Sequence, residues 1–212
     1  MLYVYVIVRT VLLNKGENIV RLEGKIGLVT AAGSGMGRAG AIRFAKEGAS
    51  VGVVDVDEDA VGSVVSEIEE NGGRAKGIVA DLTKDADSKR IVTETAKHFN
   101  GLDFVWNHVG YPGPASVEGV EMDDFDLTLD LNLRTILITT DAALTELRAR
   151  GGGSLLFTAS TSGLAGSGFS PIYSMAKFGV VGFVRALAKR VAKDNIRANA
   201  VCPGFIDTPM LG

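Results

Sequence analysis

The chain has little of several residue types, and each scarcity narrows the possible functions. Cys202 is the only cysteine among 212 residues, which rules out an intrachain disulfide and favours a reducing compartment such as the cytoplasm. The only two histidines are His98 and His108, and His98 is expected on a solvated helix face, so a metal site is not predicted. The net charge of −3 gives no electrostatic reason to expect a nucleic-acid partner.

The segment 1–19 differs in character from the rest of the chain. Its apolar part, Leu2–Leu13, contains Arg9 and is too short to span a bilayer, and it lacks the basic start and cleavage site of a signal peptide. We interpret 1–19 as a segment of doubtful origin, because codons for Lys15-Gly16-Glu17 can form a ribosome-binding site ahead of a start at Val20. The alternative is an additional strand or partner-binding arm. The mass of the protein from its source cell distinguishes the two hypotheses.

From Lys25 onward, short apolar runs alternate with helical patterns, and 46% of all residues are hydrophobic. The expected strands are Ile26–Ala31, Ser50–Asp55, Ala75–Ala80, Leu102–Trp106, Gly153–Ala159 and Ile196–Val201. The expected helices are Arg38–Glu47, Glu58–Glu70, Asp85–Phe99, Met122–Arg150 and Ile172–Val191. This alternation predicts an α/β fold, with a doubly wound parallel sheet in one domain over residues 20–212.

A glycine cluster follows the first strand and opens the first helix. It comprises Gly33, Ser34, Gly35, Met36 and Gly37. Glycines at such a turn let the backbone approach a diphosphate, and the helix N-terminus favours negative charge. The cluster therefore predicts a dinucleotide site, although a plain strand–helix turn is the alternative.

Asp55 ends the second expected strand, 18 residues after Gly37. A carboxylate at this place can accept hydrogen bonds from both adenosine ribose hydroxyls, and it would repel a 2′-phosphate. Neither Ser34 nor Val56 offers a cation to that phosphate, so NAD is expected rather than NADP. The alternative for Asp55 is a loop or helix-capping carboxylate.

Tyr173 and Lys177 stand four residues apart, on one face of an expected helix that starts after Pro171. A lysine ammonium one turn from a phenol favours the phenolate, so we expect a lowered Tyr173 pKa and a role in proton transfer. By spacing alone, an ordinary surface pair is the more common explanation. The rest of the chain decides between the two.

With these pieces, the sequence from about Arg21 to its end resembles the short-chain dehydrogenase/reductase family, a Rossmann-like fold. Tyr173 lies 13 residues after Ser160 and Asn132 lies 28 residues before Ser160, both as in the family. The resemblance implies that Tyr173 exchanges a proton with the substrate oxygen and that Ser160 holds that oxygen. It implies that Lys177 binds the nicotinamide ribose and that Asn132 anchors a water in a proton relay.

Further positions match the family less tightly. Asp81 and Leu82 resemble the adenine contacts, although Asp81 can equally belong to the turn before the next helix. Asn107 and Gly110 stand in the place of the family's Asn-Asn-Ala-Gly, where His108 and Val109 depart from it. The remaining resemblance is to the loop that meets the nicotinamide carboxamide, at Pro203, Gly204, Ile206 and Thr208.

Two departures from the family pattern matter for function. Ala31 stands where the family has its first cofactor-loop glycine, and its Cβ is expected to weaken cofactor binding. The chain also stops at Gly212, about where a substrate-covering loop, a helix and a seventh strand would follow, so the C-terminal strand and helix are expected to be missing. The sixth strand would then be an open edge.

Three functions remain open at this point. The leading one is an NAD-dependent oxidoreductase that interconverts a secondary alcohol and a ketone. The second is a 3-oxoacyl carrier-protein reductase, and the third is a catalytically silent dinucleotide-binding protein. The apolar helices Met122–Arg150 and Ile172–Val191 also suggest a homodimer or homotetramer, and neither a membrane nor a nucleic acid is expected as a partner.

Overall fold

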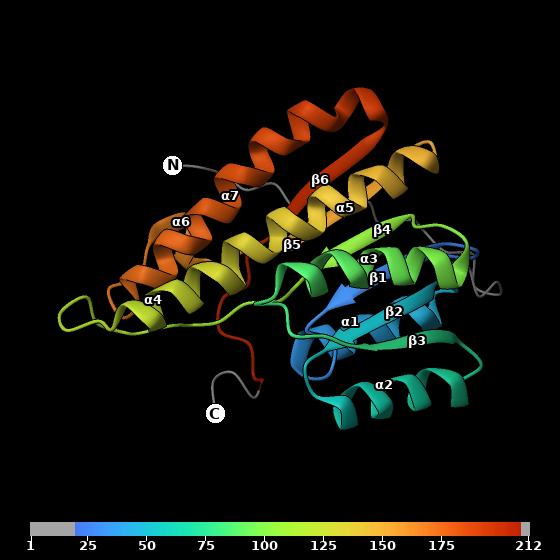
Figure 1. The fold of residues 1–212 in the computed structure, drawn as a ribbon, viewed down its shortest axis with the longest axis horizontal. Coiled ribbons are helices and arrows are strands. Elements are labelled where there is room, and N and C mark those ends of the chain that lie inside the picture. Colours follow the sequence, from blue (N-terminus) through green and yellow to red (C-terminus); the bar gives the residue numbers. More distant parts are fainter. Residues whose placement is uncertain (1–19, 209–212) are drawn as a thin grey trace, which may run out of the picture.

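The computed structural model describes residues 20–208, and the segment 1–19 with its proposed start at Val20 therefore lies almost wholly outside the described residues. Six parallel strands form one sheet in the order β3-β2-β1-β4-β5-β6, which confirms the predicted doubly wound fold (Figure 1). The strands are β1 Ile26–Thr30, β2 Ser50–Asp55, β3 Arg74–Val79, β4 Phe104–Asn107, β5 Gly153–Thr158 and β6 Ile196–Val201.

Helices cover both faces of the sheet. They are α1 Gly35–Lys46, α2 Glu58–Glu70, α3 Asp85–Phe99, α4 Met122–Leu129, α5 Thr135–Ala149, α6 Ser162–Ala165 and α7 Pro171–Val191. Helices α1 and α2 pack on one face, and α3, α5 and α7 pack on the other (Figure 1). Two separate apolar cores result, one on each side of the sheet.

The sequence explains these elements residue by residue. All five residues of β1 are buried, as expected for a central parallel strand that is covered on both faces. In α2, Val61, Val64 and Ile68 recur at helical spacing and are buried against the sheet. The Asp57 side chain begins this helix by accepting a hydrogen bond from the Ala60 amide at 3.0 Å.

The long helix expected over Met122–Arg150 is interrupted in the structure. A π-helical turn, Asp130–Arg134, separates α4 from α5. The hydrophobic pattern did not reveal it, because apolar residues continue on both sides of the turn and no glycine or proline interrupts them. The fourth strand starts at Phe104 rather than Leu102, and the short helix α6 was not expected.

The strand order places a crevice at the carboxyl ends of β1 and β4. The chain leaves β1 toward α1 on one face, and it leaves β4 toward α4 and α5 on the other. Ligands of doubly wound sheets bind at such a point, where the direction of winding changes. No helix within residues 20–208 is long and apolar enough to cross a membrane.

Candidate active site

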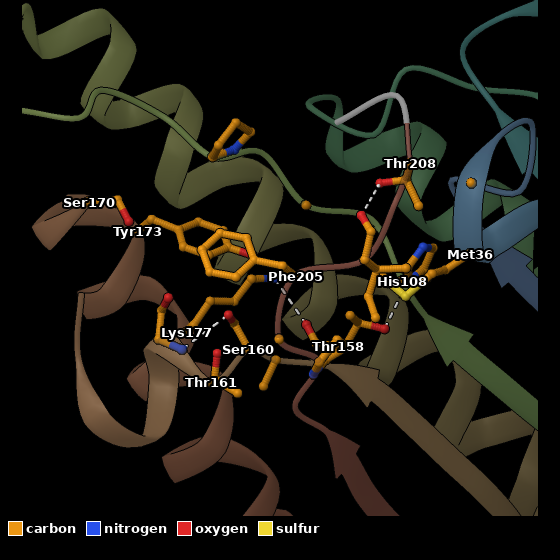
Figure 2. Close-up of a pocket in the computed structure, with 18 of the residues that line it drawn as sticks. Met36, His108, Thr158, Ser160, Thr161, Ser170, Tyr173, Lys177, Phe205 and Thr208 are labelled. Carbon is orange, nitrogen blue, oxygen red and sulfur yellow. Dashed lines mark hydrogen bonds between the residues drawn. The ribbon is translucent and has the colours of Figure 1, made fainter. Parts of the chain in front are cut away.

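A cavity of about 390 Å³ opens at the carboxyl ends of the central strands (Figure 2). It collects residues from the β1–α1 turn, the loop after β4, the end of β5, helix α7 and the loop after β6. The predicted site residues that line it are Ser34, Gly35, Met36, Gly110, Ser160, Tyr173, Lys177, Pro203, Gly204, Ile206 and Thr208. The predicted residues outside its lining are Gly33, Gly37, Asp55, Asp81, Leu82, Asn107 and Asn132.

Tyr173 and Lys177 lie one turn apart on α7, which brings both side chains to the cavity. Lys177 is 2% exposed, and its ammonium donates a hydrogen bond to the Thr158 carbonyl oxygen at 3.0 Å. Its Nζ lies 5.3 Å from the centre of the Tyr173 ring. A lysine this deeply buried is held by the fold, unlike the surface pair that the spacing alone allowed.

The pKa of Tyr173 differs from the expectation. Burial lowers the pKa of Lys177 to about 8, because the protein interior disfavours the ammonium. Burial also raises the pKa of Tyr173, and a hydrogen bond with the Ser160 hydroxyl opposes that rise only in part. The expected lowering of the Tyr173 pKa by the lysine is therefore wrong, since the lysine ammonium donates to the Thr158 carbonyl and desolvation of the phenolate dominates.

Ser160 follows β5 by two residues and lies beside Tyr173 in the cavity (Figure 2). Its Oγ accepts a hydrogen bond from the Ser162 amide at 3.1 Å, which fixes the side chain at the turn into α6. Thr161 and Ser162 also line the cavity, so several hydroxyls are available there. Only Ser160 among them contributes to the pKa of Tyr173.

Asn132 lies in the π-helical turn and is 1% exposed. Its Nδ2 donates to the Tyr111 carbonyl at 2.7 Å and to the Thr128 carbonyl at 2.8 Å. A Cβ added to Gly110 would lie 3.0 Å from Asn132 Oδ1 and 3.1 Å from Lys177 Nζ. Asn132 Oδ1 and Lys177 Nζ thus lie on the same side of Gly110. The π-helical turn that carries Asn132 is of a kind that is frequent at functional sites.

The β1–α1 turn fits a dinucleotide diphosphate. A Cβ at Gly37 would lie 1.9 Å from the Ala31 carbonyl oxygen, so only glycine fits there. The first turn of α1 contains no acidic residue, and among residues 20–208 no side chain caps it, so its amides suit an anion. Ala31 itself has a φ of 51°, the left-handed region that a family glycine would adopt without strain.

Asp55 lies at the end of β2, beside the glycine turn. Its Oδ2 accepts from the Gly33 amide at 2.8 Å and its Oδ1 from the Val56 amide at 2.8 Å. The carboxylate is thereby oriented, with further lone pairs left for a ribose. By contrast, Asp81 accepts from the Thr83 hydroxyl at 2.6 Å, a contact that lowers its pKa and belongs to the turn before α3.

The structure adds two threonines to which the sequence analysis gave no role. Thr30, at the end of β1, accepts hydrogen bonds from the amides of His108 and Val109 at 2.9 and 3.0 Å. Thr158, at the end of β5, contacts His108 and Lys177. Polar residues that end otherwise apolar parallel strands are the sequence signal that could have identified both.

Comparison with known proteins gives a consistent result. The sequence profile of the family described as short chain dehydrogenase matches residues 25–212. A 3-oxoacyl-[acyl-carrier-protein] reductase of Thermotoga maritima is 33% identical over 191 residues, which cover 90% of this chain and 78% of the relative. The crystal structure of levodione reductase is 34% identical, with a TM-score of 0.86, and the match covers 90% of this chain and 75% of that one.

A structure of a short-chain dehydrogenase from Burkholderia cenocepacia J2315 in complex with NADP is 32% identical, with a TM-score of 0.86, and it covers 90% of this chain and 78% of that one. The fold, the glycine turn, and the serine, tyrosine and lysine at one cavity agree with these likenesses. This chain belongs to the short-chain dehydrogenase family, whose members are oxidoreductases that use a nicotinamide dinucleotide.

Proposed function

We propose that this protein transfers a hydride between NAD and a secondary alcohol or ketone, with Tyr173 as the proton donor and acceptor. The observation that carries the proposal is the convergence of Ser160, Tyr173 and the buried Lys177 on one cavity beside the glycine turn. Ser160 would hold the substrate oxygen, and Lys177 would bind the nicotinamide ribose. Asn132 would order a water behind Lys177. The dinucleotide supplies the hydride acceptor or donor.

A preference for NAD over NADP is supported by Asp55. Its carboxylate is oriented by two backbone amides, and a 2′-phosphate beside it would meet like charge. Arg38, the nearest arginine along the glycine turn, is paired with Glu67 on α2. Ser34 and Val56 carry no charge that could compensate.

The cavity favours an uncharged substrate. Lys177 is the one lysine, arginine, aspartate or glutamate among its described lining residues, and its ammonium is engaged with the Thr158 carbonyl. Phe169 and Phe205 stand at the cavity with 89% and 93% of their surface exposed, which offers apolar contact to a substrate. Levodione reductase and the carrier-protein reductase are both named as reductases, which agrees with an oxo compound as substrate.

The first test is thermal unfolding of the purified chain titrated separately with NAD and NADP. A ligand at about 100 times its dissociation constant stabilises the folded state by roughly 2.7 kcal/mol, so a clear rise in Tm with NAD alone is expected. A rise with NADP alone would overturn the Asp55 argument and favour the 3-oxoacyl carrier-protein reductase.

The second test separates an enzyme from a silent binding protein. Tyr173→Phe removes the proton donor, so turnover of neutral secondary alcohols should fall by at least about a hundredfold while NAD binding persists. Tyr111→Phe makes the same substitution at the tyrosine that follows Gly110, and it should keep turnover within about threefold of wild type. Wild-type protein that binds NAD but turns over no alcohol or ketone in a broad panel would establish the silent alternative.

A further inference from the structure

His108 departs from the family pattern and lies at the cavity without a role in the proposed reaction. Its ring packs at the end of β4, 4.7 Å from the Trp106 ring, and faces the cavity beside Met36 (Figure 2). The His108 Nδ1 lies 2.8 Å from the Thr158 hydroxyl. A histidine held in this way presents its other nitrogen in a fixed direction.

The hydrogen-bond pattern around Thr158 determines which nitrogen carries the proton. The Trp106 Nε1–H can only donate, and it donates to Thr158 Oγ1 at 2.8 Å. Within residues 20–208, the other partner of this oxygen is His108 Nδ1. If Nδ1 carried the proton, the Thr158 hydroxyl proton would have no acceptor among the described residues. Donation from Thr158 to Nδ1 satisfies all three groups, and it places the imidazole proton on Nε2.

The Nε2 edge of the ring points toward the start of α1. A Cβ added to Gly37 would lie 2.8 Å from His108 Cδ2, the carbon bonded to Nε2. The first turn of α1 is also where the backbone amides and the helix dipole favour an anion. His108 and Lys177 both contact Thr158, so the imidazole lies on the same side of this turn as the lysine that would bind the nicotinamide ribose.

We propose that His108 is a cofactor-positioning residue whose neutral imidazole donates a hydrogen bond from Nε2 to the nicotinamide-side phosphate of the bound dinucleotide. Thr158 sets the tautomer, and Trp106 holds Thr158. The imidazole stays neutral near pH 7, because burial and the charge of Lys177 lower the pKa of His108 to about 4. This inference rests on the proposed function, since it requires the dinucleotide to lie over the β1–α1 turn.

Binding measurements test the inference without turnover. ADP-ribose carries both phosphates, whereas AMP lacks the nicotinamide-side phosphate. His108→Phe keeps a ring but removes the donor, so calorimetry should give about tenfold weaker binding of ADP-ribose and NAD, with AMP binding unchanged. His108→Gln places an amide donor near the Nε2 position, and it should restore ADP-ribose affinity to within about threefold of wild type. His98→Gln on the surface of α3 is the matched control and should change neither affinity.

Nitrogen-15 spectra of the imidazoles provide a second measurement in wild-type protein. With two histidines in the chain, the spectrum is simple, and His98→Gln assigns it. The signals of His108 should show a protonated Nε2 and an unprotonated Nδ1, and ADP-ribose should slow the exchange of the Nε2 proton. A proton on Nδ1, or His108→Phe that binds ADP-ribose as tightly as wild type, would overturn the inference. Wild-type protein that binds neither NAD nor ADP-ribose would instead overturn the proposed function.

Discussion

Ala31 places an L-residue in the left-handed region of backbone space, with a φ of 51°. That conformation costs a residue with a Cβ roughly 1–2 kcal/mol, whereas a glycine adopts it freely and loses more chain entropy on folding. Ala31→Gly should therefore stabilise the fold by about 0.5–1 kcal/mol, measured as a higher urea midpoint with unchanged slope. It should also tighten dinucleotide binding, because the turn relaxes toward the family conformation.

The control for this variant is another residue of the same conformation. Asn100 has a φ of 63° at the end of α3, where asparagine is tolerated. Asn100→Gly should change the free energy of unfolding by less than Ala31→Gly does. Equal stabilisation by both variants would show that strain at Ala31 is not the cause.

The buried ammonium of Lys177 is predicted to lower the free energy of unfolding, although the proposed reaction needs this residue. Its pKa falls to about 8 in the fold from an ordinary value of 10.5, so the unfolded chain binds the proton more tightly. Stability should thus rise with pH between about 8 and 10.5, and the cost of the buried ammonium below pH 8 is at most about 3 kcal/mol. Lys177→Met removes this cost but also removes the hydrogen bond to Thr158, so it should raise the free energy of unfolding at pH 7 by about 1–2 kcal/mol. The same variant should abolish turnover.

Lys189→Met supplies the control, because Lys189 is an exposed lysine on the same helix. Lys189→Met should leave the free energy of unfolding within about 0.5 kcal/mol of the wild-type value, and it should leave turnover intact. Destabilisation by Lys177→Met of several kcal/mol would contradict this account of the buried charge.

Because the pKa of His108 is lowered in the fold, we predict that this residue makes the folding stability fall in acid. Its folded pKa of about 4 lies below the ordinary value of 6.5, so protonation favours the unfolded chain. The wild type should lose up to about 3 kcal/mol through this group as the pH falls from about 6.5 to about 4, and His108→Gln should lose correspondingly less. Urea unfolding of the two proteins across this range isolates the difference, since carboxylates titrate in both. Parallel curves would mean that the His108 pKa is not lowered.

At the residue scale, the sequence predicted which side chains meet but not their surroundings. The meeting of Ser160, Tyr173 and Lys177 at one cavity was predicted from the family resemblance, because the spacing of Tyr173 and Lys177 alone also allowed an ordinary surface pair. The direction of the Tyr173 pKa depended on burial and on where the lysine charge points, and neither can be read from spacing.

At the scale of elements, the cap of α2 allows a clean prediction. The Asp57 side chain accepts from the Ala60 amide, and it is the residue that begins the helix behind Asp55. Asp57→Ala should destabilise the fold by about 1 kcal/mol, observed by thermal or urea unfolding. Asp59→Ala removes a charge from the same first turn without removing the cap, so it should cost less. Equal effects would reduce the role of Asp57 to helix-dipole electrostatics.

Strands and helices with clear ends were predictable to the residue. The ranges of β2, α2, α3 and β6 agree with the structure, because Gly, Asn or Asp punctuates each of them. The π-helical turn and α6 could not be predicted, since their hydrogen bonds depend on packing around Asn132 and on the turn at Ser160. Both irregular elements lie next to the candidate site.

At the scale of the whole molecule, we propose that the chain assembles through the outward sides of α4, α5 and α7. Exposed apolar side chains lie on these helices, namely Met122, Leu137, Met175 and Phe178. Light scattering should therefore show a dimer or tetramer at micromolar concentration. The double variant Leu137→Glu with Phe178→Glu should shift the protein toward monomer, whereas Phe169→Glu at the cavity should not. A monomeric wild type would contradict the proposal.

The strand order also bears on the order in which the two halves of the sheet form during synthesis. Within residues 20–208, strands β1 to β3 pair among themselves over a contiguous stretch of sequence, strands β4 to β6 do the same, and the pairing of β1 with β4 joins the two sets of strands. Local pairings form sooner than distant ones, and the N-terminal part leaves the ribosome first. We therefore expect the half that bears the glycine turn and Asp55 to take shape while Ser160, Tyr173 and Lys177 are still being synthesised. If Asp55 contacts the adenosine ribose as proposed, a nascent chain would be able to hold that end of the cofactor before it has any means of moving a proton.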